Sequence, residues 1–213
     1  MNENSLIKIV NYFYKSNTYI IEYQDRLAFV IDPGFDWLKI EGYLAEHKLI
    51  PTHVFCTHGH FDHVGSVTKI VETYGAISMI HKADLKMAKT SNFLMMAYGL
   101  EERINTPVFQ STITGGERFE FGNDELRIEH VPGHSAGSCF LFFKNLLFSG
   151  DTFYSEGIGL PSPEQDDNLL RNSLLRWRHV IPNETMVCPG HGEIKPYGDI
   201  CLDNKELISF LHE

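Results

Sequence analysis

The first part of the chain alternates short apolar runs with polar residues at a spacing typical of strands. Three β-rich runs come first, at Leu6–Phe13, Thr18–Tyr23 and Leu27–Ile31, and the polar residues between them predict a meander of hairpins. Asp36–Lys48 then carries apolar residues at helical spacing. The pattern therefore predicts a small antiparallel sheet followed at once by an amphipathic helix.

Strand and helix signals continue to alternate along the rest of the chain. The further strands that we expect are His53–Cys56, Ile77–Ile80, Arg118–Phe121, Leu126–Val131, Cys139–Phe143, Leu146–Phe148 and Thr185–Cys188. The further helices that we expect are Val64–Tyr74, Lys82–Lys89, Gln165–His179 and Asn204–Leu211. Strands interspersed with helices indicate an α/β layered fold, and we expect a single domain over residues 1–213.

The segment Thr90–Pro107 departs from this pattern. It has no clean period, and it carries bulky apolar residues such as Phe93, Met95, Met96 and Tyr98. We interpret it as a lid-like helical insertion at about 90–107 that forms an apolar wall for a substrate. Packing into the core and a homodimer interface are the alternatives that remain open.

A short internal echo links the two halves of the sequence. Phe29–Asp32 resembles Leu147–Asp151, and Val54–His58 resembles Met186–His191. In both halves an apolar run ends at an aspartate, and a later run ends just before a histidine. The echo hints at two related strand-and-helix halves.

The composition of the chain argues against nucleic-acid and membrane partners. The 213 residues carry a formal net charge of −10 and no long basic run, which argues against nucleic acid, whose affinity depends on Lys and Arg meeting phosphates. No apolar run approaches the roughly 20 residues that span a bilayer, so we expect no membrane partner. Met1–Val10 has Lys8 inside its apolar stretch, unlike a signal peptide, and the four cysteines form no CxxC motif. We therefore expect a cytoplasmic protein that acts on a small molecule.

The strongest chemical signal is the run Thr57–His63, which places three imidazoles and one carboxylate within six residues. In an extended or tightly turned backbone, alternate side chains share a side. His58, His60 and Asp62 can then converge, while His63 turns elsewhere. Neutral imidazole and ionised carboxylate suit a metal such as zinc. The structural alternative is that Asp62 simply caps the next helix.

Three further loops each place one ligand-type residue just after an apolar strand. The residues are His134, Asp151 and His191, each beside a glycine. Taken singly, each loop is typical of a turn. Taken together, they bring two histidines and an aspartate to the same edge of a sheet, where ligands bind in α/β proteins.

The order His-x-His-x-Asp-His, His, Asp, His closely resembles the metallo-β-lactamase superfamily. The details around Ile31–Gly34, Pro132–Ser138 and Phe148–Phe153 are similar to small glyoxalase II-like hydrolases. The resemblance implies an αββα sandwich of two mixed β-sheets flanked by helices. Full-length glyoxalase II carries a C-terminal helical domain with glutathione-binding residues. This chain has about twenty residues after His191, so we leave glutathione recognition open.

The resemblance also implies a ligand set for two metal ions. One ion would be held by His58, His60 and His134; the second by Asp62, His63 and His191; Asp151 would bridge them. Two zinc ions are our default, and the same ligands accept iron or manganese.

Four residues are expected to have roles in the reaction, Asp62 and Asp151 from the resemblance, and Tyr154 and Asp32 from their positions in the sequence. A metal-bound hydroxide would attack a carbonyl carbon. The ligand Asp62 would orient this hydroxide, and Asp151 would be the bridging ligand. Tyr154 is a candidate donor to the oxyanion, with a core or surface role as its alternative. Asp32 is expected to orient a ligand histidine, or else to be a turn residue.

We therefore predict a dinuclear metal hydrolase that cleaves a small-molecule thioester or ester, similar to hydroxyacylglutathione hydrolase. One alternative is a persulfide dioxygenase with a single iron on His58, His134 and Asp151. A lactonase or β-lactamase-like hydrolase is another, and a metal-binding protein without turnover is the third. A nuclease like ribonuclease Z is disfavoured by the net charge.

Overall fold

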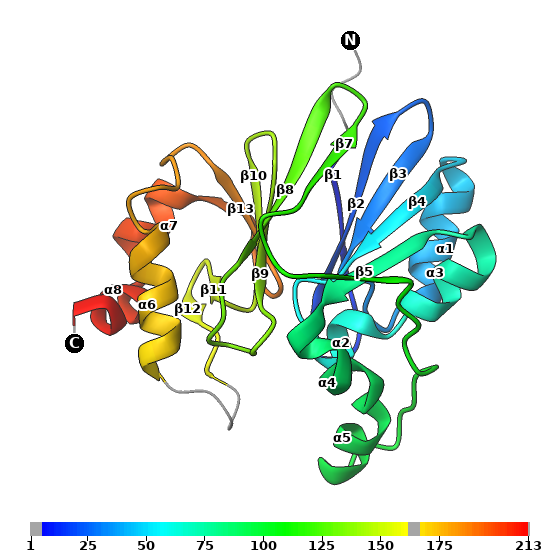
Figure 1. Ribbon diagram of the computed structural model, residues 1–213, viewed down its shortest axis with the longest axis horizontal. Helices are drawn as coiled ribbons and strands as arrows, with labels where there is room; N and C mark the ends of the chain where they lie inside the picture. The colour runs from blue at the N-terminus through cyan, green and yellow to red at the C-terminus, as the bar shows by residue number, and fades with distance from the viewer. Residues whose placement is uncertain (1–5, 162–166, 213) are drawn as a thin grey trace. The chain divides into compact units, whose positions relative to one another are not determined.

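The computed structural model describes residues 6–161 and 167–212 (Figure 1). The chain divides into two compact units, unit 1 (Met1–Ile113) and unit 2 (Thr114–Glu213), which are described one at a time. The sequence expectation of a single domain over residues 1–213 stays a prediction.

Unit 1 is built on a six-stranded mixed sheet with strand order β1-β2-β3-β4-β5-β6. Its strands are β1 (Leu6–Val10), β2 (Asn17–Gln24), β3 (Leu27–Ile31), β4 (Ile50–Phe55), β5 (Ile77–His81) and β6 (Ser111–Ile113). The first three pair antiparallel, as the predicted meander requires, and β3 to β6 pair parallel. The carboxyl ends of β3, β4 and β5 therefore meet at one edge of this sheet.

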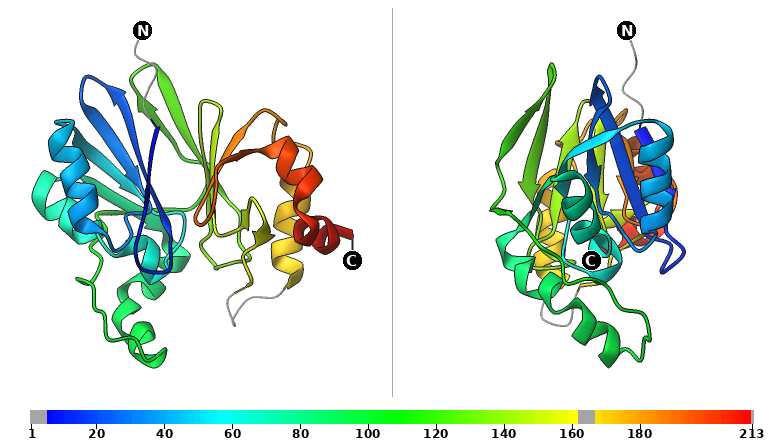
Figure 2. Two further views of the ribbon diagram at one scale, coloured as in Figure 1. Left: turned by 180° about the vertical axis from the view of Figure 1, so that it is seen from behind. Right: turned by 90° about the vertical axis from the view of Figure 1, so that its right-hand side faces the viewer.

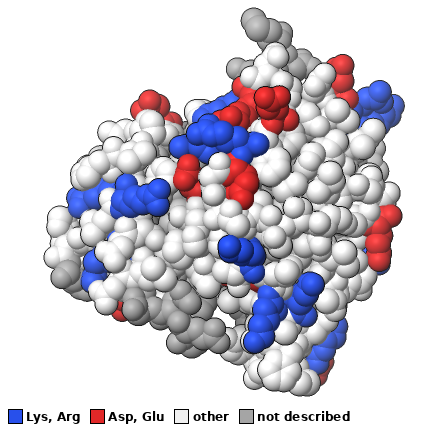
Figure 3. Space-filling view, viewed as in Figure 1, with Lys and Arg blue, Asp and Glu red and all other residues white. Residues whose placement is uncertain are grey.

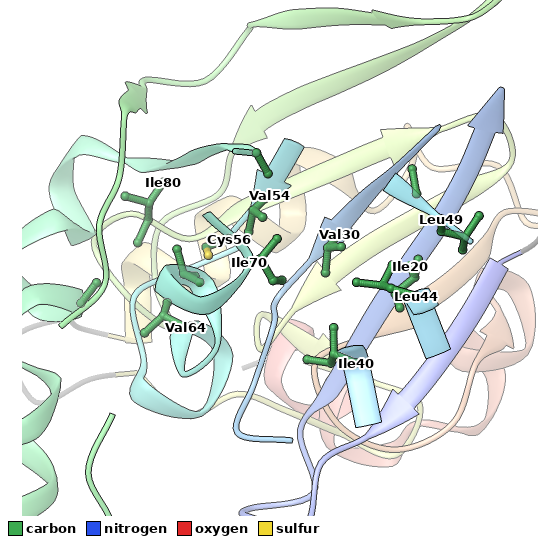
Figure 4. Close-up of a cluster of buried hydrophobic side chains, with 14 residues drawn as sticks. Ile20, Val30, Ile40, Leu44, Leu49, Val54, Cys56, Val64, Ile70 and Ile80 are labelled. Carbon is green, nitrogen blue, oxygen red and sulfur yellow. The ribbon is translucent and has the colours of Figure 1, made fainter. Parts of the chain in front are cut away.

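Helices cover one face of this sheet and crowd its carboxyl edge. They are α1 (Trp37–Glu46), α2 (Phe61–Val64), α3 (Val67–Tyr74), α4 (Leu85–Lys89) and α5 (Ser91–Ala97), with a 3-10 turn at Lys82–Asp84. The apolar stripes of α1 and α3 pack on the strands, where Ile40, Leu44 and Ile70 meet residues such as Val30 and Val54 (Figure 4). Alternate strand residues supply this core because strand side chains point to opposite faces.

Unit 2 is built on a second six-stranded mixed sheet, with order β14-β13-β10-β9-β8-β7. Its strands are β7 (Arg118–Phe121), β8 (Asp124–His130), β9 (Cys139–Phe143), β10 (Leu146–Gly150), β13 (Met186–Pro189) and β14 (Lys195–Pro196), and β11 (Phe153–Tyr154) pairs with β12 (Gly157–Ile158). Only β10 and β13 pair parallel among these. The strands β8, β10 and β13 all run in one direction and end at the same edge.

Three helices pack on one face of this second sheet, where the left view of Figure 2 shows them in yellow to red. They are α6 (Asp167–Trp177), α7 (Tyr197–Asp203) and α8 (Lys205–His212). Leu170, Leu174 and Trp177 of α6 join Phe140 and Leu147 in the core of unit 2. Two mixed sheets with helices packed on them confirm the predicted fold class.

The sequence located most of these elements and missed the shortest ones. The expected helix Val64–Tyr74 is found as α3 and begins at Val67, since Val64 ends the separate helix α2 and the chain turns at Gly65 and Ser66. The start of the expected helix Gln165–His179 lies outside the described residues, and its described part is α6. The elements not anticipated are β6, β11, β12, β14 and α7; the four strands have two or three residues each, too short for a visible period.

The surface carries charges of both signs. Blue and red side chains adjoin over β7 and β8 in the space-filling view (Figure 3), where Arg118 pairs with Glu125 and Arg127 with Glu129. Such exposed pairs contribute only about 0–1 kcal/mol. Among the described helices, none has both the length and the apolar character needed to cross a bilayer.

Candidate metal centre

The parallel pairing of β3 and β4 brings the two chemical signals of unit 1 together. Asp32 follows β3, and Thr57 and His58 follow β4 after Cys56. The Asp32 N–H donates to the carbonyl of Phe55 at 3.0 Å, which continues the sheet one residue beyond the strand. The carboxylate of Asp32 therefore lies beside the histidine loop, as the strand-edge argument predicts.

The histidine loop converges more than the sequence suggested. The ring of His58 lies 4.8 Å from that of His60 and 4.2 Å from that of His63, between ring centroids. The expectation that His63 turns elsewhere is wrong, because the helix α2 begins at Phe61 and alternation holds only for extended backbone. Asp62 lies in the first turn of α2, and His60 occupies the cap position that was the alternative for Asp62.

Asp32 is buried and orients this loop. Its Oδ1 accepts the Thr57 N–H at 2.7 Å, and its Oδ2 accepts the Thr57 hydroxyl at 2.6 Å and lies 3.1 Å from His63 Nδ1. Asp32, His58 and His63 offer possible ligand atoms within 4.8 Å of one another. Because both carboxylate oxygens already accept hydrogen bonds, we assign Asp32 to orienting His63, as the sequence predicted, and reject a plain turn role.

These hydrogen bonds indicate which ring nitrogen His58 and His63 can present to a metal ion. A carboxylate can only accept, so His63 Nδ1 donates to Asp32 and its Nε2 keeps a lone pair. The Thr57 hydroxyl donates a hydrogen bond to Asp32, so its oxygen can accept one from His58 Nδ1, 3.0 Å away. His63 Nε2 lies 3.4 Å from Asp62 Oδ2. Two ligands of one tetrahedral zinc ion are separated by roughly 3.4 Å, so this spacing fits a metal ion.

The Asp32→Asn variant is expected to bind metal about 10- to 100-fold more weakly. Asparagine tolerates the left-handed backbone at this position, where φ is 49°. Its amide has only one oxygen, however, so it cannot accept all the hydrogen bonds that the two carboxylate oxygens of Asp32 accept from Thr57 and His63. Competition with a chromogenic chelator measures the affinity. The Asp25→Asn variant in the β2–β3 turn, also at positive φ, is the matched control. An unchanged affinity in Asp32→Asn would contradict the orienting role.

In unit 2, three strand ends deliver the other predicted residues. His134 follows β8, Asp151 follows β10 and His191 follows β13. The N–H of Gly190 donates to the carbonyl of Gly150 at 2.8 Å, which holds two of these loops together. The sequence echo thus has a structural counterpart, because each unit pairs an aspartate strand with a histidine strand in parallel.

The three side chains of unit 2 have the spacing of shared metal ligands. Asp151 Oδ2 lies 3.2 Å from His191 Nε2 and 3.9 Å from His134 Nε2. His134 Nδ1 lies 2.9 Å from the carbonyl of Leu160, which can only accept, so Nε2 again keeps the lone pair. Both distances are close to the roughly 3.4 Å expected for two ligands of one ion.

Tyr154 lies beside this group. Its ring is 5.8 Å from that of His191 in an edge-to-face arrangement, and Asn204 donates to its carbonyl at 3.1 Å. The contact with His191 places the tyrosine next to a predicted ligand. Its role as a donor to an oxyanion stays a prediction.

Sequence reasoning missed the buried residues that support the histidine loop. Asp84 Oδ2 accepts the N–H of Gly59 at 2.9 Å, and Gly59 has no room for a side chain because a Cβ would lie 2.8 Å from the Asp84 carbonyl. Ser16 donates to the carbonyl of Asp62 at 2.7 Å. Asp84 and Ser16 are 25 and 46 residues away in sequence, and no motif marks either.

Two histidines outside the proposed ligand set, and one buried cysteine, have structural roles. His81 accepts the Ala83 N–H, and His130 Nε2 lies 2.9 Å from the Ala136 carbonyl. Burial, and secondarily the charge of Asp32, raises the pKa of the Cys56 thiol well above its usual value. Cys56 therefore stays a neutral thiol, which binds metal poorly.

The sequence of this chain is similar to those of a known family and of several related proteins. Residues 11–191 match the sequence profile of the Metallo-beta-lactamase superfamily. The probable metallo-hydrolase YqgX of Bacillus subtilis (strain 168) is 30% identical over 185 residues, which are 84% of this chain and 85% of that protein. A hydroxyacylglutathione hydrolase of Nitrosomonas eutropha is 28% identical over 84% of this chain and 62% of its own length.

Solved structures agree with the sequence relatives. TTHA1623 in a di-iron-bound form has a TM-score of 0.83 and 30% identity, over 93% of this chain and 98% of that one. The BLEG-1 B3 metallo-beta-lactamase has a TM-score of 0.81 and 25% identity, over 98% of this chain and 100% of that one. The profile spans every strand end that carries a predicted histidine or aspartate ligand. The chain therefore belongs to the metallo-β-lactamase superfamily.

Proposed function

We propose that the protein is a dinuclear metal hydrolase that cleaves a small-molecule thioester or ester. The observation that carries the proposal is shared by His58, His63 and His134. In each of these rings, Nδ1 forms a hydrogen bond with an oxygen of the protein, so that the lone pair of Nε2 can bind a metal ion.

The proposed ligand assignment follows the family pattern. His58, His60 and His134 would hold one ion; Asp62, His63 and His191 would hold the other; Asp151 would bridge the two. Two divalent ions would supply Lewis acidity that activates water near neutral pH and polarises a carbonyl. Zinc suits this donor set, and the di-iron form of a 30% identical structure supports iron as a second choice.

The residues of the chain itself have distinct tasks in this proposal. Asp62 accepts a hydrogen bond from the attacking water and so directs its lone pair to the carbonyl carbon. Asp151 would help to hold the ions, and its negative charge would offset part of their positive charge. Tyr154 donates its hydroxyl proton in a hydrogen bond to the oxygen on which negative charge develops.

The choice of a thioester rests on the relatives. Several related proteins are named hydroxyacylglutathione hydrolase, with 28% to 31% identity. The chain spans 62% and 57% of the length of two of them. We therefore propose the bond type, a thioester or ester, and leave the thiol part open.

A metal-exchange experiment tests the proposal. The metal-free protein, prepared with a chelator, is expected to hydrolyse no thioester, and activity should return on adding about two equivalents of Zn²⁺ or Fe²⁺ per chain. Release of free thiol, measured with Ellman's reagent, gives the rate. Oxygen consumption on a persulfide with one iron per chain would replace this function with the dioxygenase. Full metal content without turnover of thioesters, esters, lactones or β-lactams would leave a metal-binding protein.

A further inference from the structure

Six aromatic side chains form a continuous group in unit 1, called here the aromatic surface. Its members are Tyr12, Phe13, Tyr14, Phe35, Phe61 and Tyr98. The Phe61 ring is central, with centroid distances of 5.4 Å to Tyr14 and 6.4 Å to Tyr98. These separations lie in the range of favourable aromatic pairs.

The aromatic surface begins at the metal-binding loop. Phe61 lies in the chain between His60 and Asp62, both proposed ligands, and is only 6% exposed. Tyr14 and Tyr98 extend outward from it and are 54% and 65% exposed. Large exposed rings gathered in one patch mark a binding site rather than ordinary surface.

The lid-like segment contributes only part of its apolar residues to this surface. Met95 is fully buried, which favours the core alternative for that residue. Tyr98 follows α5 and contacts Phe61. The segment therefore reaches the metal-binding loop through its last aromatic residue.

The loop that carries Tyr14 is held in place before any ligand arrives. Tyr14 and Lys15 both adopt left-handed backbone, with φ of 55° and 58°, which is unfavourable for side chains of this size. Asn11 stabilises the loop through two hydrogen bonds to the Ser16 carbonyl, each 2.9 Å. Ser16 in turn donates to the Asp62 carbonyl. A surface fixed in this way loses little entropy on binding.

The carboxylate of Asp36, next to Phe35, is compensated by two donors. Asp36 Oδ2 accepts the Tyr12 N–H at 2.8 Å and the Lys39 ammonium at 2.6 Å. The exposed rings of Tyr14 and Tyr98 offer flat apolar faces to a ligand. Such faces favour an uncharged, planar group.

We infer that the aromatic surface binds the acyl group of the substrate and makes the enzyme selective for aromatic acyl groups. This inference rests on the proposed function, because it takes the reacting carbonyl to lie at the ligands that flank Phe61. The preferred substrate is then a thioester or ester of an arylacetic or related aromatic acid.

Two thioesters with one common thiol test the inference. The metal-loaded protein is assayed with the S-acetyl and S-phenylacetyl esters of N-acetylcysteamine, and kcat/KM should favour the phenylacetyl ester. In the Tyr14→Ala/Tyr98→Ala double variant, that preference should fall on the order of 10-fold, with the acetyl ester little affected. The Tyr14→Phe/Tyr98→Phe variant keeps both rings and should keep the preference. Leu38→Ala, at a 79% exposed residue of α1, is the surface control.

A binding measurement separates this inference from the proposed function. Calorimetry with the uncleavable phenylacetyl ketone analogue should show about 10-fold weaker binding to the double alanine variant. Weaker binding without hydrolysis of either thioester would contradict the proposed function alone. Hydrolysis of both thioesters with the same preference in wild type and double variant would overturn the inference. A dimer that dissociates in the double variant, with selectivity unchanged, would also overturn it and assign the surface to subunit contact.

Discussion

The Asp151→Ala variant is expected to lose thioester hydrolysis by at least about 10³-fold. Asp151 Oδ2 lies within 4 Å of Nε2 of both His134 and His191, so its removal takes away a carboxylate that lies beside both histidines. A 10³-fold loss in rate corresponds to roughly 4 kcal/mol in activation free energy. The rate of thiol release at saturating metal measures it.

Asp199→Ala is the matched control for this loss. Asp199 is an exposed aspartate of unit 2, in the first turn of α7, and its removal should leave hydrolysis unchanged. Bound metal should also fall in Asp151→Ala and stay at the wild-type level in Asp199→Ala. Wild-type turnover by Asp151→Ala would show that this aspartate has no part in the reaction.

The Gly159→Ala variant is expected to lose both stability and activity. A Cβ at this position would lie 1.6 Å from the Asp151 carbonyl oxygen and 2.8 Å from His134 Nδ1. Neither neighbour can yield easily, because one is backbone and the other is hydrogen-bonded to Leu160. We expect a loss of about 3 kcal/mol in the free energy of unfolding, measured by urea denaturation, with metal binding weakened as well.

Gly157→Ala tests whether this effect is specific. Gly157 lies two residues earlier in the same segment, and its Cβ would meet chiefly the flexible end of the Glu206 side chain. Its unfolding free energy should stay within about 1 kcal/mol of wild type. Equal losses of unfolding free energy in both variants would mean that any substitution in this segment is destabilising, and that the contact with Asp151 is not the cause.

The long elements and the strand-edge site could be predicted because their signals are local. An apolar run such as Cys139–Phe143 shows its period within a few residues, and Asp151 and His191 each follow such a run directly. Parallel pairing then brings the ends of β10 and β13 together. The family pattern added the order of the ligands, which strand signals alone do not give.

The parts that sequence reasoning missed depend on contacts between distant segments. Asp84 supports Gly59 only because η1, the turn at Lys82–Asp84, packs on the histidine loop. The direction of His63 depends on where α2 begins, a boundary of one or two residues that periodicity does not resolve. The short strands β11 and β12 likewise have no pattern of their own.

The most direct test of the central claim is a crystal structure of the metal-loaded protein with anomalous diffraction at the zinc or iron edge. We predict two ions per chain, one contacting Nε2 of His58 and the other contacting Nε2 of His63, with Asp151 bound to both. A single ion, or two ions that leave these nitrogens without a metal, would contradict the claim.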